Sequence, residues 1–239
     1  QENYILPTSS SYVQVFELYK IWIKYREKEN SGANGWQRHV PSHRFMFPEK
    51  YLQNKLYLFD HGTSEYNKAI SALPDGFTMK RLGFDSLSAV ENLQLKVVDG
   101  MENKNLFYPL SREELIESMQ LDYVSGIFSP DGRMAAFSVI VSNRDGERSL
   151  ASDVHLNPSE VFTFDAVAVD NEYRGRGFQR TFIGWSIDLA KSTGVKHIVA
   201  TVDPQNIPSE RNFLAEGFHV AETKTKYIGL TRDILRLDV

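Results

Sequence analysis

Glycines and arginines crowd into one short stretch that could hold an anion. Residues 173–177 read YRGRG, and the set extends into the residues that follow. Glycine lets the backbone approach a ligand closely, and the free N–H groups and positive dipole end of a helix N-terminus attract negative charge. We therefore expect a phosphate or pyrophosphate ligand. The expected binding residues are Arg174, Gly175, Arg176, Gly177, Phe178, Gln179 and Arg180.

Two common phosphate-binding motifs are absent from the chain. Gly-x-x-x-x-Gly-Lys-Ser/Thr does not occur, and Gly-x-Gly-x-x-Gly would need glycine where the chain has Arg180. A different phosphate carrier is therefore expected. The alternative is that the two glycines only form a turn between a strand and a helix.

The elements on either side of this stretch would position it. Residues 162–169 predict a strand that is buried on both faces, and alternation would place Phe162, Phe164, Ala166 and Ala168 on one face and Thr163, Asp165, Val167 and Val169 on the other. Asp165 is the one charged residue of this strand. After the glycines, apolar residues recur at helical spacing until Gly194, which is expected to end a helix.

Composition limits the class of protein. The 239 residues are 41% hydrophobic, which suits one large globular domain or a domain with an extension. The absence of cysteine excludes disulfides and cysteine-bound zinc and is compatible with a cytoplasmic location. A net charge of -4 argues against nucleic acid as the main partner. Without a long apolar run or a signal-peptide pattern, we expect no membrane partner.

Residues 1–76 are expected to form an N-terminal extension that packs on the main domain, residues 77–239. An aromatic amphipathic helix near residues 12–28 needs apolar cover, and the segment is short for an independent domain. His39 and His43 have the spacing of a metal pair. Pro41 lies between them and no third ligand is near, so we predict no metal site.

Residues 77–239 alternate between strand and helix patterns. Expected strands cover residues 77–82, 123–128, 134–141, 162–169, 196–202, 219–226 and 231–238. Expected helices cover residues 86–98, a segment opened by a capping box at residues 111–114, residues 178–193 and residues 206–216. Residues 142–159 are polar and are expected to form a loop.

In the order of these elements and in two motifs, residues 77–239 resemble the GNAT superfamily of acyl-CoA-dependent N-acyltransferases. The stretch RGRGFQ at residues 174–179 is similar to the family's Arg-x-x-Gly-x-Gly/Ala loop, with Gln179 in place of the last Gly or Ala. The pattern Asn206-x-x-Ser209-x-x-x-Phe213-x-x-x-Gly217-Phe218 is similar to the family's Asn-x-x-Ala-x-x-x-Tyr-x-x-x-Gly-Phe. Three further stretches, FYPLSREEL, ATVDPQN and TKYIGLTRDIL, resemble a bacterial branch of the family.

The resemblance implies a fold and an activity. The fold would be α/β, with a central mixed, mostly antiparallel sheet flanked by helices. The activity would be N-acetyltransfer from acetyl-CoA, as co-substrate, to a primary amine of a small molecule or peptide. Transfer would be direct, in a ternary complex, because the chain has no cysteine and no evident activated serine. Whether the protein forms a homodimer is left open.

The resemblance also assigns roles to residues outside the glycine loop. In the family, the central strand parts from its neighbour and pairs with pantetheine. Here Val167, Ala168 and Val169 would do this, and Asn206 and Phe213 would also contact the cofactor. Asn206 could equally serve as a helix cap.

Two residues are the catalytic candidates by the same resemblance. Asp165 lies where many family members carry a glutamate base, and its shorter side chain favours a base that acts through water. Its alternative role is to accept structural hydrogen bonds. Phe213 stands where members often carry a tyrosine acid, so Tyr227 is the substitute candidate.

Two other functions remain open at this point. One is an acetyl-CoA-binding sensor or interaction module that has lost catalysis. The other is a nucleotide-binding protein that uses the glycine turn for a different phosphate ligand.

Overall fold

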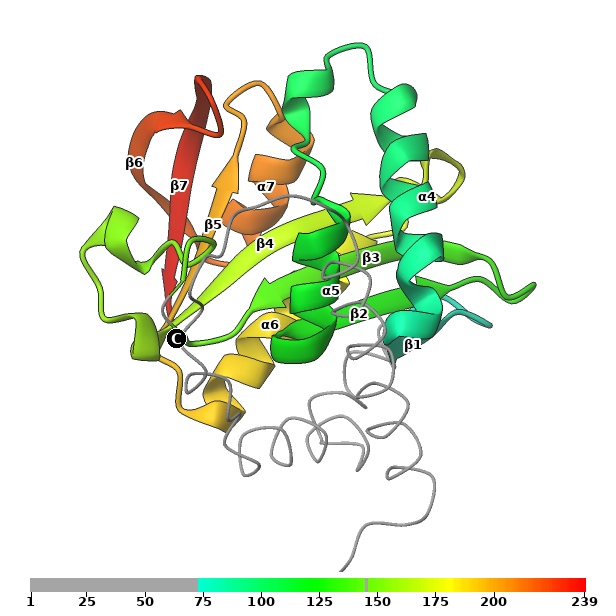
Figure 1. Cartoon of the computed structure of the whole chain (residues 1–239), viewed down its shortest axis with the longest axis horizontal. Coiled ribbons are helices and arrows are strands. Elements are labelled where there is room, and N and C mark those ends of the chain that lie inside the picture. The colour runs from blue at the N-terminus through cyan, green and yellow to red at the C-terminus, as the bar shows by residue number, and fades with distance from the viewer. Residues whose placement is uncertain (1–72, 145) are drawn as a thin grey trace, which may run out of the picture. The chain divides into compact units, whose positions relative to one another are not determined.

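A computed structural model describes residues 73–144 and 146–239 of the chain. The predictions for residues 1–72, including the aromatic helix and His39 and His43, lie outside the described residues. The described strands form one seven-stranded sheet in the order β1-β2-β3-β4-β5-β7-β6 (Figure 1). They are β1 (Thr78–Arg81), β2 (Tyr123–Phe128), β3 (Met134–Val141), β4 (Val161–Val169), β5 (His197–Val202), β6 (His219–Lys226) and β7 (Leu230–Asp238).

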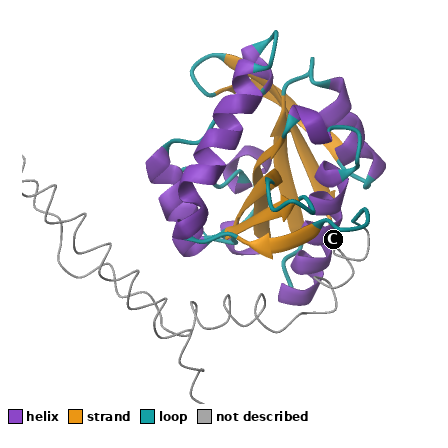
Figure 2. Ribbon diagram, turned by 90° about the vertical axis from the view of Figure 1, so that its right-hand side faces the viewer, coloured by secondary structure: helices purple, strands orange, loops and turns teal. Residues whose placement is uncertain are grey.

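The sheet is mixed and mostly antiparallel, as predicted. Only β4 and β5 run parallel, and every other neighbouring pair is antiparallel. Helices cover both faces of the sheet (Figure 2). They are α4 (Leu87–Asp99) and α5 (Arg112–Leu121) on one face, and α6 (Phe178–Thr193) and α7 (Ile207–Ala215) on the other.

Short 3₁₀ turns occupy several connections between these elements. They are η1 (Phe84–Ser86), η2 (Lys104–Leu106), η3 (Ala151–Val154), η4 (Pro158–Glu160) and η5 (Asn171–Tyr173). The segment between β3 and β4, expected as a plain loop, therefore contains η3 and part of η4. Asn157 starts η4 by accepting a hydrogen bond from the Ser159 N–H.

Local sequence signals explain where two of the helices begin and end. At the start of α5, the Glu114 N–H donates to the Ser111 hydroxyl (3.2 Å) and the Ser111 N–H donates to the Glu114 carboxylate (2.7 Å), which confirms the capping box. Helix α6 is bounded by Gly177 and Gly194, both in the left-handed region with φ of 81° and 73°. Glycine is favoured at both positions because a Cβ makes this conformation costly.

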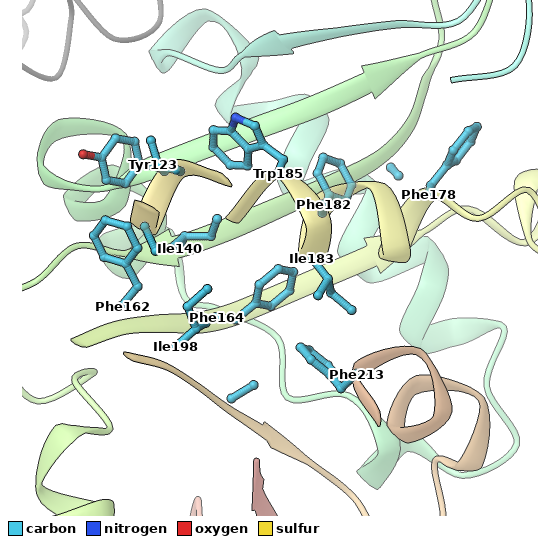
Figure 3. Close-up of a cluster of buried hydrophobic side chains, with 14 of the residues drawn as sticks. Tyr123, Ile140, Phe162, Phe164, Phe178, Phe182, Ile183, Trp185, Ile198 and Phe213 are labelled. Carbon is cyan, nitrogen blue, oxygen red and sulfur yellow. The ribbon is translucent and has the colours of Figure 1, made fainter. Parts of the chain in front are cut away.

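The largest apolar cluster lies between the sheet and α6 (Figure 3). Phe162 of β4 is fully buried, as are Phe182 and Ile183 of α6. Tyr123 of β2 packs edge-on against Phe162 and against Trp185, with ring centroids 5.6 and 6.4 Å apart. This packing fixes α6, and with it the glycine turn at its N-terminus, against β4.

A β-bulge in β4 overturns the predicted alternation of its faces. Val139 of β3 pairs with Ala166 and Ile140 pairs with Phe164, so Asp165 is an extra residue in β4. Phe162 and Phe164 face α6, whereas Ala166 and Ala168 face α4 and α5. The prediction that these four residues share one face was wrong, because one inserted residue reverses the side on which later side chains lie.

The parallel pairing of β4 with β5 ends where the bulge begins. Register runs from Val161 opposite His197 to Phe164 opposite Ala200, and β5 then continues to Val202 with only β7 as its partner. Figure 1 shows the two strands diverging beyond this point. The β5-facing edge of residues 165–169 therefore lacks a partner strand within the described sheet.

We predict that Phe182→Ala destabilises the fold strongly. Phe182 is fully buried in the α6 cluster, so truncation leaves a cavity and should lower the free energy of unfolding by about 3–5 kcal/mol. Leu214→Ala on α7 is the control, because this side chain is 43% exposed and should cost less than about 1 kcal/mol. Urea unfolding measures both. Equal losses in the two variants would contradict this description of the core.

Candidate functional site

The glycine turn between β4 and α6 has the geometry of an anion site. Gly175 and Gly177 have φ of 78° and 81°, and a Cβ placed on either would meet no atom within 4 Å. Hydrogen bonding within α6 begins with the Thr181 N–H, which donates to the Gly177 carbonyl (2.9 Å). The N–H groups of the preceding three helical residues therefore have no acceptor within the helix. Open space and free donors together suit a phosphate oxygen.

The three arginines of this region differ in what they contact. Arg174 and Arg176 are exposed, and the Arg176 guanidinium lies over the ring of Phe77 at 5.6 Å. Arg180 forms an ion pair with Glu216, at 2.7 Å between nitrogen and oxygen. The charge of Arg180 is thus already balanced, and its role at an anion remains a prediction.

Gln179, the departure from the expected motif, joins two helices. Its amide nitrogen donates to the Ser209 hydroxyl (2.7 Å), and its amide oxygen accepts from Asn212 (2.8 Å). Both partners belong to α7, so this side chain fixes α7 beside the start of α6. Phe178 is buried against Phe77, which leaves its backbone N–H as the group that can reach a ligand.

A cavity of about 270 Å³ lies where β4 and β5 diverge. It contains five of the predicted site residues, namely Asp165, Val167, Asn206, Phe213 and Tyr227. The glycine turn, Ala168 and Val169 do not line it. Ala168 is buried against the helices of the opposite face. Residues of the segments 106–110 and 147–150 also line the cavity.

Asp165 is a nearly buried carboxylate in the wall of this cavity. Its side chain is 9% exposed, and the nearest cation is Arg148, with Nη2 at 3.2 Å from Oδ2. No described residue donates a hydrogen bond to Oδ2. Burial raises the pKa of Asp165 to about 6, Arg148 opposes this shift, and the carboxylates of Asp122 and Glu114 add to it. Asp165 is therefore ionised at neutral pH yet basic enough to take a proton.

Tyr227 faces the same cavity from the β6–β7 turn. Its hydroxyl lies 2.9 Å from the Thr201 hydroxyl, and its ring stacks on Tyr108 with centroids 4.9 Å apart. Tyr227 and Ile228 both adopt positive φ, at 45° and 59°. Such strained backbone is common near functional sites. Burial raises the pKa of Tyr227, so the phenol keeps its proton at neutral pH.

Asn206 and Phe213 position the cavity wall formed by α7. Asn206 caps the helix, since its side-chain oxygen accepts from the Ser209 N–H (3.4 Å), and its amide nitrogen donates to the Leu106 carbonyl (3.4 Å). Phe213 is buried and packs edge-on against Phe164, with centroids 5.3 Å apart. The cap role is confirmed, and contact of either residue with a cofactor stays a prediction.

Comparison with known proteins identifies the fold and the family. The family described as Acetyltransferase (GNAT) matches residues 102–218. The match places residues 102–218 in the GNAT superfamily. No curated protein sequence matches it significantly.

Solved structures share the fold at low sequence identity. The ribosomal-protein-S18-alanine N-acetyltransferase from Escherichia coli is 18% identical, with a TM-score of 0.52 over 68% of this chain and 94% of that one. The protein yncA from Salmonella typhimurium, solved with its cofactor acetyl-CoA, is 17% identical, with a TM-score of 0.53 over 69% and 94%. An N-acetyltransferase from Staphylococcus aureus Mu50 is 18% identical, with a TM-score of 0.53 over 68% and 98%.

Two arginines of this GNAT domain were missed by the sequence reasoning. Arg148 contacts Asp165 from a polar segment that gave no periodic signal. Arg232 is 3% exposed and pairs with Asp203 at 2.7 Å across the cavity wall. The strand that contains Arg232 also carries Asp233, Arg236 and Asp238, so its charge alone did not single it out.

Neither a metal cluster nor a membrane span is found in the described parts of the chain. Residues 73–144 and 146–239 contain no group of three or more His, Asp or Glu side chains placed to hold a metal ion. None of their helices combines the length and the apolar character needed to cross a bilayer.

We predict that Gly177→Asp abolishes stabilisation of the protein by acetyl-CoA. The new side chain would place a negative charge at the expected pyrophosphate position. Gly194→Asp is the matched control, because Gly194 lies at the other end of α6, also has positive φ and is also free of neighbours within 4 Å. Both variants should lose about 1–2 kcal/mol from backbone strain.

Thermal unfolding with and without acetyl-CoA separates the two effects. The ligand-induced rise in Tm should persist in Gly194→Asp and vanish in Gly177→Asp. An undiminished rise in a folded Gly177→Asp protein would remove the glycine turn from the cofactor site.

Proposed function

We propose that this protein transfers an acetyl group from acetyl-CoA to a primary amine in a ternary complex. The carrying observation is that Asp165 and Tyr227 line one cavity beside the unpartnered edge of β4, the strand that is followed by the anion-type glycine turn. The acceptor would be a small molecule or a peptide. The solved relative with bound acetyl-CoA supports the choice of cofactor.

The residues present fit acetyl-CoA. The glycine turn offers free N–H groups for a pyrophosphate, and the unpartnered edge of residues 165–169 offers backbone groups to an extended amide chain. Val167 lies at this edge and lines the cavity. When bound, acetyl-CoA supplies an activated acetyl thioester.

Asp165 would accept the proton that the acceptor amine must lose. Its side chain lines the cavity, and its buried Oδ2 receives no hydrogen bond from the described residues, so the carboxylate keeps its capacity to accept a proton. The short aspartate side chain favours relay through water. With a pKa of about 6, the carboxylate is ready to act at neutral pH.

Tyr227 would be the nearest proton donor for the leaving thiolate. Its phenol is protonated at neutral pH, and the Thr201 hydroxyl orients it. A strong acid is not required, because a free thiol has a pKa of about 8.5 and its thiolate is a tolerable leaving group. Phe213, at the family's tyrosine position, has no proton to give.

Turnover of a panel of amines, with thiol release as the readout, tests the proposal. Release that depends on one class of amine would support acetyl transfer. Stabilisation by acetyl-CoA with no turnover of any amine would favour a sensor or interaction module. Stabilisation by ATP and not by CoA would favour a nucleotide-binding protein.

We predict that Asp165→Asn lowers turnover by about 10²-fold or more at neutral pH. Asparagine keeps the size of the side chain and removes its ability to accept a proton. The acetyl-CoA-induced rise in Tm should be retained, which controls for folding and cofactor binding. In the wild type, the rate should fall as pH drops through about 6, where Asp165 becomes protonated. A normal rate in the variant would move the base elsewhere, Asp203 being the next candidate.

We also predict small effects at the two aromatic positions. Tyr227→Phe should lower the rate only modestly, since solvent can protonate the thiolate, and Phe213→Tyr should raise it less than about tenfold. Steady-state rates with acetyl-CoA binding measured in parallel decide this. A loss above about 10³-fold in Tyr227→Phe, with binding intact, would make Tyr227 an essential acid.

A further inference from the structure

Four charged side chains form a network of ion pairs that extends from the protein interior to the cavity. Asp122, at the junction of α5 and β2, is fully buried. Arg144 and Arg148, from the segment between β3 and β4, form ion pairs with Asp122. Arg148 also forms an ion pair with Asp165. Arg144 also pairs with the Glu117 carboxylate at 3.0 Å, and both Arg148 and Asp165 line the cavity.

Arg144 balances most of the charge of Asp122, so the charge of Arg148 can act on Asp165. The Arg144 Nε and Nη2 donate to the two oxygens of Asp122, both at 3.1 Å. Ser142 donates to Asp122 as well, from its N–H at 3.1 Å and its hydroxyl at 3.2 Å. The closest approach of Arg148 to Asp122 is longer, at 3.4 Å. The buried charge of Asp122 is therefore balanced mainly by Arg144.

Arg148 is held in place by α5. Its Nη1 donates to the Glu114 carbonyl (2.9 Å) and its Nη2 donates to the Ser118 hydroxyl (2.6 Å). The side chain is only 11% exposed. These bonds go to neutral groups, so they fix the position of the guanidinium without reducing its charge.

The contact between Arg148 and Asp165 combines closeness with poor hydrogen-bond geometry. Nη2 lies 3.2 Å from Oδ2, yet Oδ2 accepts no hydrogen bond and the Arg148 Nε donates none among the described residues. The cation therefore lowers the energy of the ionised carboxylate without forming a hydrogen bond to this buried oxygen.

The surroundings of Asp165 show why such a cation is needed. The charged and titratable groups around it are Glu114 and Glu117 of α5, Asp122, Arg144, Glu147 and Arg148, Asp203 after β5, and Lys226, Tyr227 and Arg232 of the β6–β7 hairpin. Asp122, Glu114 and Glu117 all disfavour a second negative charge at Asp165, as burial does. Arg148 is the cation that opposes them.

We propose that Arg148 is a positioning residue that keeps the carboxylate of Asp165 ionised in the wall of the cavity. The role of Asp165 as a base rests on the proposed function, but the electrostatic link between the two residues does not. Arg148 also lines the cavity, and its proposed effect on the reaction acts through Asp165. It would set the pH range in which the site works.

The first test measures Asp165 directly and needs no turnover. Full-length protein labelled with ¹³C at the aspartate carboxyl carbons is titrated by NMR, and the Asp165 signal is assigned by its loss in Asp165→Asn. In Arg148→Met, which keeps the aliphatic stem, the titration midpoint of Asp165 should rise by about one pH unit or more. Arg112→Met is the control, because Arg112 is an exposed arginine of α5 that pairs with Glu91. It should leave the midpoint unchanged.

A second variant preserves every charge in case Arg148→Met does not fold. Ser118→Ala removes one anchor of Arg148, so the guanidinium can shift toward Asp122, and the Asp165 midpoint should rise by a smaller amount. If Arg148→Met folds, an unchanged titration midpoint of Asp165 in that variant would overturn the proposal. If it does not fold, an unchanged midpoint in Ser118→Ala would overturn it.

The rate profile then separates this inference from the proposed function. With an active amine, the acid limb of the rate against pH should move upward in Arg148→Met by the same amount as the NMR midpoint, with the high-pH plateau retained within about threefold. A general structural defect would lower the plateau without moving the limb, which would count against the proposal. If the wild type acetylates no amine while the NMR midpoint still moves, the proposed function fails and the positioning role of Arg148 stands.

Discussion

The single extra residue in β4 is the constraint on which the site depends. At Asp165 the pairing with β3 shifts register and the pairing with β5 has just ended. One irregularity therefore frees a strand edge and turns a carboxylate out of a strand that is otherwise apolar. A regular β4 would continue its ladder with β5, and no cavity could form between the two strands.

The rest of the fold holds this irregularity in place. The aromatic cluster under α6 fixes β4 from one face, and Gln179 joins α6 to α7, which forms the far wall of the cavity. Arg232 joins Asp203 to the Asn105 carbonyl, which lies next to the lining segment 106–110. Core packing and a few buried polar contacts thus set the width of the opening between β4 and β5.

Much of this fold was predictable because its signals are local. The strands at residues 123–128 and 134–141, the capping box at Ser111 and the glycine ends of α6 all follow from patterns of a few residues. The bulge was not predictable in this way, since it depends on how β3 aligns with β4. Arg148 was missed for a related reason, because its partners Ser118, Asp122 and Asp165 are distant in sequence and only the fold brings them together.

Asp165 also shows why function and stability oppose each other at this position. Its pKa is raised from 3.8 to about 6 in the folded protein, so the native state holds the proton more tightly than the unfolded chain does. The free energy of unfolding therefore falls as pH rises from about 4 to about 6. The loss, about 3 kcal/mol for this shift, persists at neutral pH. The cost would be larger without Arg148. Arg148 reduces this cost without forming a hydrogen bond to Oδ2. The fold therefore tolerates a buried base that can still react.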